Sequence, residues 1–96
     1  MTREEFFDRI AAYRPELARA GVRRLGVFGS VARDEAGPES DVDILVEFEE
    51  VPNLLEFAAL RERLVEILGR PVDLTTPQGL RQHLRSRVLR EVRYAA

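Results

Sequence analysis

The sequence predicts an α+β fold: a small mixed β-sheet of three or four strands, with helices packed mainly on one face. Apolar runs at residues 22–28, 41–48 and 72–75 have the length of strands. The segments around them repeat apolar residues every three or four positions, as amphipathic helices do. At 96 residues the chain has room for one hydrophobic core, so we expect a single domain over residues 1–96.

The N-terminal segment has the signals of a helix followed by a break. Thr2 and Glu5 form a capping-box pattern, in which two side chains satisfy backbone N–H groups of the first turn. Pro15 does not fit the interior of a helix. The sequence therefore predicts a break near residues 13–14 and a short second helix that ends at Gly21.

Glycine and serine follow the first strand. A short helix is expected from Ser30 to Glu35, with residues 37–38 (Gly-Pro) ending it. The second strand is expected over residues 41–48, where charged residues at its end mark its return to water.

Two further helices are predicted. Asn53 and Glu56 repeat the capping-box pattern, and a long helix follows with a buried stripe of six residues: Leu54, Phe57, Leu60, Leu64, Ile67 and Leu68. After the third strand, residues 76–77 (Thr-Pro) resemble a cap and a first helical position. The C-terminal helix that they predict has an apolar side with a four-residue period: Leu80, Leu84, Val88 and Val92.

Composition excludes several classes of protein. There is no cysteine, hence no disulfide framework and no thiolate metal site. Neither a signal peptide nor a membrane-spanning run is visible, so we expect a cytoplasmic protein with no membrane partner. The net charge of −2 gives no general attraction to nucleic acid, and we expect no direct binding to it. Five arginines near the C-terminus are expected on a solvated helix face or, alternatively, at a docking surface.

Two carboxylates at the second strand point to a metal site. Asp41 and Asp43 are two residues apart, so on an extended strand they project from the same face. Adjacent carboxylates repel each other unless a cation lies between them. Mg²⁺ or Mn²⁺, which prefer oxygen ligands, suit such a pair. Asp73 on the third predicted strand offers another carboxylate.

The turn after the first strand suits a phosphate. Backbone N–H groups and a hydroxyl at Gly29 and Ser30 are able to donate to phosphate oxygens. We expect Gly29, Ser30 and the three acids, Asp41, Asp43 and Asp73, to converge at one end of the sheet.

These residues together resemble a known family. Phe28-Gly29-Ser30, ten intervening residues, and then Asp41 and Asp43 match the signature of the DNA polymerase β-like nucleotidyltransferase superfamily. Residues 32–33 (Ala-Arg), Ser40 and Asp73 are similar to its minimal members. The resemblance extends over nearly the whole chain and implies the nucleotidyltransferase fold.

The resemblance implies a role for each matching position. Asp41 and Asp43 would bind Mg²⁺ and, through it, ATP. Asp73 would complete the metal site or take the proton of the attacking hydroxyl. Gly29 and Ser30 would hold phosphates. Arg33 is a further candidate for phosphate binding, with an ordinary salt bridge to Asp34 or Glu39 as the alternative.

The resemblance also implies an activity and a partner. Minimal members typically are antitoxins that transfer AMP to a tyrosine hydroxyl of a HEPN-domain ribonuclease toxin, so we expect a hetero-oligomer with such a toxin. Two alternatives stay open. One is a non-catalytic antitoxin that neutralises the toxin by binding, and the other is a catalytic subunit that modifies a small-molecule acceptor.

Overall fold

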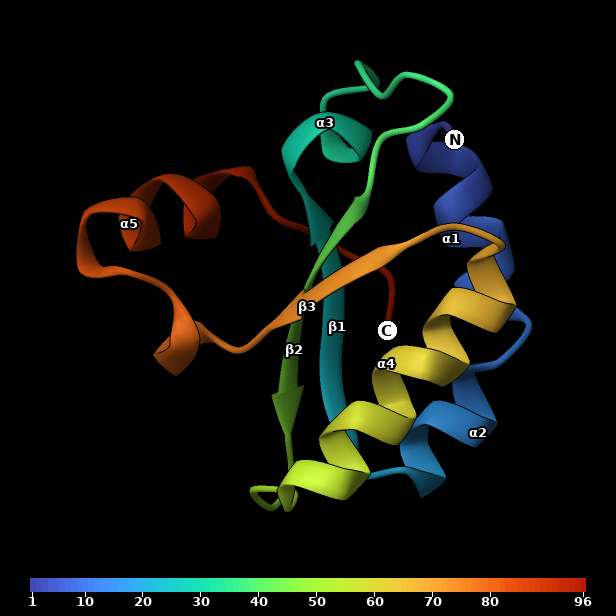
Figure 1. Ribbon diagram of the computed structural model, residues 1–96, viewed down its shortest axis with the longest axis vertical. Helices are drawn as coiled ribbons and strands as arrows, with labels where there is room; N and C mark the ends of the chain where they lie inside the picture. The colour runs from blue at the N-terminus through green and yellow to red at the C-terminus, as the bar shows by residue number, and fades with distance from the viewer.

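The computed structural model describes residues 1–96, and a four-stranded sheet forms its centre (Figure 1). In spatial order the strands are β3 (Val72–Thr75), β2 (Val42–Phe48), β1 (Val22–Phe28) and β4 (Arg93–Tyr94). β2 runs parallel to β3, whereas β1 is antiparallel to both β2 and β4. The predicted mixed sheet and α+β class are confirmed, and β1 has the predicted bounds.

The helices lie mainly on one face of the sheet, as predicted. α1 (Arg3–Ala11), α2 (Arg14–Arg19) and α4 (Leu54–Leu68) are grouped on the right in Figure 1, and α5 (Gln82–Glu91) lies on the left. α4 forms the long connection that a parallel pair of strands requires, here from β2 to β3. None of the helices combines the length and the apolar character that a bilayer-spanning helix needs.

Two helices start at the predicted capping residues. The Thr2 hydroxyl accepts a hydrogen bond from the Glu5 backbone N–H at 3.1 Å. Asn53 and Glu56 form a complete capping box at the start of α4, with bonds of 2.8 and 2.9 Å. Gly69 ends α4 in the left-handed conformation, at a φ of +69°, which glycine adopts without steric cost.

The helix after β1 is shorter than predicted. α3 spans Gly29–Ala32, so the prediction of a helix as far as Glu35 is wrong. Asp34 adopts a φ of 57°, a left-handed conformation that aspartate tolerates better than most residues. Its carboxylate accepts a hydrogen bond from the backbone N–H of Arg3 at 2.7 Å. The end of α3 is therefore stabilised by a contact with α1, which is distant in sequence.

The C-terminal segment also departs from the prediction. The Thr76 hydroxyl does act as a cap, accepting from the Gly79 N–H at 3.1 Å, but it begins only a 3₁₀ turn, η1 (Pro77–Gly79). α5 starts later, at Gln82, so Leu80 lies outside it. The chain beyond α5 then pairs with β1 as β4.

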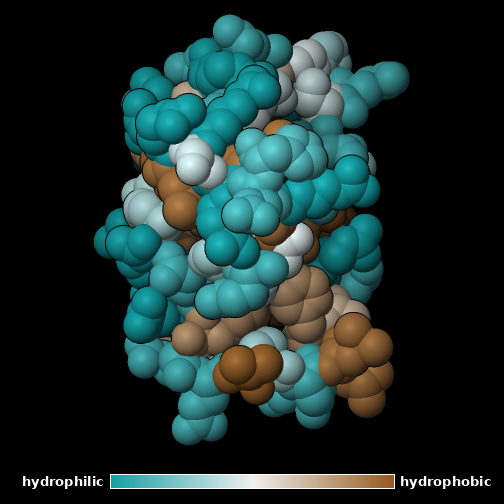
Figure 2. Space-filling view, turned by 90° about the vertical axis from the view of Figure 1, so that its left-hand side faces the viewer, coloured by the Kyte–Doolittle hydropathy of each residue, from teal (hydrophilic) through white to brown (hydrophobic).

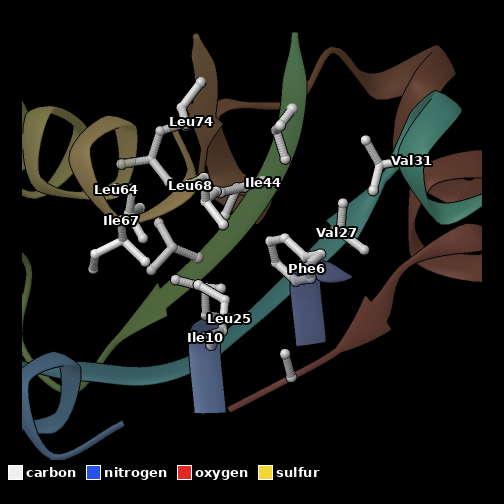
Figure 3. Close-up of a cluster of buried hydrophobic side chains, with 14 of the residues drawn as sticks. Phe6, Ile10, Leu25, Val27, Val31, Ile44, Leu64, Ile67, Leu68 and Leu74 are labelled. Carbon is white, nitrogen blue, oxygen red and sulfur yellow. The ribbon is translucent and has the colours of Figure 1, made fainter. Parts of the chain in front are cut away.

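The main hydrophobic core lies between the sheet and helices α1, α2 and α4. Strand residues at alternate positions point into it, as the two-residue period of a strand dictates. From β2 these are Val42, Ile44 and Val46. Figure 3 shows side chains from sheet and helices meeting in this core: Leu25, Val27, Ile44 and Leu74 from the strands, and Phe6, Ile10, Leu64, Ile67 and Leu68 from the helices.

The first turn of α4 projects beyond this core. The prediction that Leu54 is buried is wrong, because the residue is 83% exposed. Leu55 and Val51 beside it are also exposed, and the fully buried stripe begins only at Leu60. Figure 2 shows hydrophobic groups at the lower end of the molecule, where Figure 1 places the β2–α4 connection.

A smaller apolar cluster lies on the opposite face of the sheet. It joins β2 to α5 and the residue after it: Leu45, Val88 and Val92. Asp43 and Glu47, which flank Leu45 on the same face of β2, are only partly buried. α5 therefore covers part of this face and leaves polar side chains accessible beside it.

Candidate active site

Two of the predicted acids lie opposite each other on neighbouring strands. Asp43 of β2 is the register partner of Asp73 of β3 in the parallel pair. Paired strands lie about 4.8 Å apart, so the side chains of partner residues point to the same face and are close neighbours. Ile44 and Leu74, the next residues of each strand, belong to the main core. Asp43 and Asp73 therefore point to the other face, the one that α5 partly covers.

The third predicted acid, Asp41, lies immediately before β2 and is exposed, whereas Asp43 is partly buried. The charges of Asp41 and Asp73 both act on the carboxyl of Asp43 and raise its pKa. The structure thus brings the three acids into one electrostatic neighbourhood, with Asp43 at its centre.

The pKa of Asp43 is raised from 3.8 to about 6. Burial is the largest cause, because the charged form loses hydration. The charges of Asp73 and Asp41 come next, the Arg33 guanidinium opposes them, and the carboxylate of Glu91 adds to the rise. Negative charge is therefore in excess around Asp43.

Gly29 packs directly against Asp43. A Cβ atom built on Gly29 would lie 2.2 Å from Oδ2 of Asp43, a distance at which atoms collide. Gly29 also has a φ of +70°, a backbone conformation that residues other than glycine rarely adopt. Ser30, which is partly buried, follows in the first turn of α3, where backbone N–H groups lack helical acceptors. The predicted phosphate turn is therefore in contact with Asp43, the central acid.

Arg33 lies immediately after α3, and two carboxylates hold its guanidinium. Its Nε donates to Glu35 at 2.9 Å, and its Nη1 bonds the carboxylate of Glu91 on α5. The alternative prediction, a salt bridge from Arg33 to Asp34 or Glu39, names the wrong acids. Asp34 pairs with Arg3 instead. Arg33 is thus an ordered cation beside the acids.

The acids fit a divalent cation in chemistry, although they do not form a closed set of ligands. All three donors are carboxylates, the oxygen ligands that Mg²⁺ and Mn²⁺ prefer. No three acidic or histidine side chains lie close enough together to form a ready metal-binding cluster. A cation would therefore have to draw the acids together against their mutual repulsion.

The acids lie on an open surface. None of the five main cavities of the structure is lined by Asp41, Asp43 or Asp73. Asp41 and Asp73 are therefore accessible from solvent, whereas Asp43 between them is partly buried.

Sequence reasoning missed one residue of this neighbourhood, Glu91. It is the last residue of α5, and its side chain is only 17% exposed. The sequence holds one signal of it, because Glu91 is the single acid among the five C-terminal arginines. That pattern does not identify the partner of Glu91, which is Arg33, the residue immediately after α3.

Comparisons with known proteins identify the family of the chain. A model of the nucleotidyltransferase domain family matches residues 8–95. The protein adenylyltransferase MntA of Thermococcus cleftensis is 50% identical over 95 residues, which cover 98% of this chain and 96% of that protein. A solved structure provisionally named a minimal nucleotidyltransferase has a TM-score of 0.82 at 45% identity, covering 97% of this chain and 95% of that one.

A more distant match shows the same fold. A chain from the complex of tri-AMPylated Shewanella oneidensis HEPN toxin with MNT antitoxin has a TM-score of 0.60 at 16% identity, covering 90% of this chain and 71% of that one. The resemblance seen in the sequence is thus confirmed over nearly its full length. The chain belongs to the family of nucleotidyltransferase domains.

Proposed function

We propose that residues 1–96 act as one metal-dependent nucleotidyltransferase domain that moves AMP from ATP to a hydroxyl acceptor. The observation that carries the proposal is the pairing of Asp43 with Asp73 on adjacent strands, in contact with the turn at Gly29. Nucleotidyl transfer needs positioning and charge neutralisation more than covalent help. Carboxylates that converge beside a phosphate-binding turn meet both needs.

Each side of the site has a proposed role. Asp41 and Asp43 would hold Mg²⁺ or Mn²⁺, which when bound neutralises triphosphate charge and polarises the reacting phosphoryl group. The backbone N–H groups of Gly29 and Ser30 would donate to phosphate oxygens.

Proton transfer and charge balance involve two further groups. Asp73, which is exposed on the edge strand β3, would complete the metal site or accept the proton of the attacking hydroxyl. The bond from that oxygen to the α-phosphorus forms as the bond to pyrophosphate breaks. Arg33 would donate to a phosphate oxygen and so offset the added negative charge.

We further propose that the acceptor is a tyrosine hydroxyl of a HEPN-domain ribonuclease toxin, with this chain as its antitoxin. Two matches support this: the 50% identical relative is named a protein adenylyltransferase, and a chain of similar fold comes from a complex containing an AMPylated HEPN toxin. The open face also supports it, since a hydroxyl on a folded protein is able to reach the acids.

The test combines this protein, a HEPN-domain toxin encoded beside it, labelled ATP and Mg²⁺. Label is expected on the toxin, and peptide mapping is expected to place it on tyrosine. Asp43→Asn should abolish labelling, while Glu62→Gln, which alters an exposed carboxylate of α4, should leave it unchanged. Unlabelled toxin in the presence of the wild-type protein would overturn the proposed acceptor, and label on small molecules instead would indicate a metabolite acceptor.

One observation favours a second candidate, an antitoxin that acts by binding alone. The three acids are not gathered into a closed metal-binding cluster. The double variant Asp41→Asn/Asp43→Asn discriminates between the two candidates. If it neutralises the toxin at substoichiometric amounts as well as the wild type does, catalysis is dispensable.

A further inference from the structure

Glu91 forms a bridge between α5 and α3. One carboxylate oxygen bonds Nη1 of Arg33, and the other lies 4.0 Å from Nε of Arg87, one turn earlier in α5. The side chain of Glu91 is 17% exposed, against 68% for that of Arg87. Glu91 is therefore an enclosed carboxylate whose short contact is to Arg33.

The short helix α3 connects this bridge to the acids. The backbone N–H of Arg33 donates to the carbonyl oxygen of Gly29 at 3.2 Å, and Gly29 packs against Asp43. Contacts therefore run without a gap from α5, through Glu91, Arg33 and Gly29, to the central acid of the site.

The apolar contact between α5 and the sheet is small, with Phe28, Leu80 and Tyr94 partly buried at its margin. The apolar contacts of α5 form a small buried cluster with β2: Leu45, Val88 and Val92. Among the elements of the fold, α5 packs chiefly against α3. The Glu91–Arg33 pair is the polar part of that contact, and together with the Glu35 bond to Nε it sets where the guanidinium points.

Without Glu91, Arg33 has a competing partner. The guanidinium is attracted to the carboxylate of Asp43 as well as to Glu91. An Arg33–Asp43 pair would occupy the carboxylate that is proposed to receive the metal. It would also remove the guanidinium from the position proposed for a phosphate oxygen.

We propose that Glu91 is a positioning residue that holds Arg33 beside the acids, ready for a nucleotide phosphate and away from Asp43. This inference rests on the proposed role of Arg33 in nucleotide binding. In this proposal Glu91 binds neither nucleotide nor metal itself. Its effect should therefore appear in the affinity for the metal–nucleotide complex and act mainly through Arg33, beside the smaller direct effect of its charge on Asp43.

A double-mutant cycle tests the inference. Affinity for a non-hydrolysable ATP analogue with Mg²⁺ is measured for the wild type, Glu91→Gln, Arg33→Ala and the double variant. Glu91→Gln is expected to weaken binding about three- to tenfold, in line with the loss of one charge-assisted contact. KM for ATP should rise more than kcat falls. In the Arg33→Ala background, Glu91→Gln should have a much smaller effect, limited to the direct action of its charge on Asp43.

Two controls separate positioning from a purely structural role. Arg87→Gln removes the distant cation of Glu91 and should leave binding unchanged, as should Glu62→Gln on α4. If Glu91→Gln lowers the melting temperature, Glu91→Asp, which keeps the charge on a shorter side chain, replaces it in the cycle. Equal losses from the Glu91 variant with and without Arg33 would overturn the inference.

The outcome is distinguishable from failure of the proposed function. If the wild type neither binds the analogue nor transfers AMP, the proposed function is wrong. If the wild type is active, Asp43→Asn is inactive and the Glu91 variants bind like the wild type, only the positioning role is wrong.

Discussion

The carboxylate of Asp43 lies so close to the backbone of Gly29 that no side chain fits between them. This contact joins the end of β1 to the start of β2 and brings the glycine turn and the central acid together. A side chain added at residue 29 would therefore displace the carboxylate of Asp43.

Gly29→Ala is expected to displace Asp43 and to strain the backbone, because the added Cβ would collide with Oδ2 and the φ of +70° disfavours alanine. A shift of about 1 Å in a reacting group typically costs on the order of a hundredfold in rate, and we expect a loss of that size in AMP transfer. Gly21→Ala is the matched control. It also has a positive φ, +88°, but open space around it, so it should cost about 1 kcal/mol of stability and leave the rate intact. A fully active Gly29→Ala variant would contradict the contact.

The raised pKa of Asp43 predicts a pH-dependent stability of the metal-free protein. The folded state keeps this proton up to about pH 6, whereas the unfolded state loses it near 3.8. Between these values the folded state binds more protons, so the contribution of Asp43 to the free energy of unfolding falls as the pH rises. Urea denaturation at a series of pH values measures it. The Asp43→Asn variant should lack this component and exceed the wild type in stability above about pH 6; a constant difference between the two across the window would refute the assignment.

Divalent cations should stabilise the folded protein. Mutual repulsion of Asp41, Asp43 and Asp73 is relieved when a cation binds between them, and a ligand that binds only the folded state raises its melting temperature. Thermal unfolding near neutral pH with and without millimolar Mg²⁺ should show the increase in the wild type. Asp43→Asn should remove it, whereas Asp8→Asn, at an exposed acid of α1, should not. An equal rise in all three proteins would indicate a general ionic effect.

Two leucines of α4 should differ sharply in their contribution to stability. Leu64 is fully buried in the main core, and Leu54 is 83% exposed. Leu64→Ala is expected to lower the free energy of unfolding by about 2–5 kcal/mol, because it leaves a cavity. Leu54→Ala should change it by less than about 0.5 kcal/mol. Chemical denaturation of both variants measures the difference, and similar values would contradict the observed position of the first turn.

Local signals in the sequence were sufficient for much of the fold. The bounds of β1, the caps at Thr2 and Asn53 and the break before α2 all depend on residues close in sequence. The prediction failed where contacts with a segment distant in sequence determine the local structure. Asp34 ends α3 together with α1, and β4 exists only because it pairs with β1. Leu54 has the helical period of a buried residue, but no other element reaches it.

For the candidate site too, local sequence signals predicted some residues, and others depend on the folded structure. The motif and its spacing identified Gly29, Asp41 and Asp43, and the strand pairing then placed Asp73 beside Asp43. The partner of Arg33 was not predictable, because Glu91 belongs to a helix whose placement depends on the folded sheet. The chemical roles of the candidate site residues stay predictions that the experiments above address.

The alternation of side chains along β2 also protects the site from misassembly. Val42 and Ile44 face the main core, and Asp43 between them faces away from it. If β2 paired with its neighbours one residue out of step, Asp43 would enter the core and Ile44 would take its place on the open face. An unpaired carboxylate in a protein interior costs on the order of several kcal/mol. The strand register that buries Val42 and Ile44 therefore also places Asp43 outside the core, and it does so during folding, before any nucleotide binds.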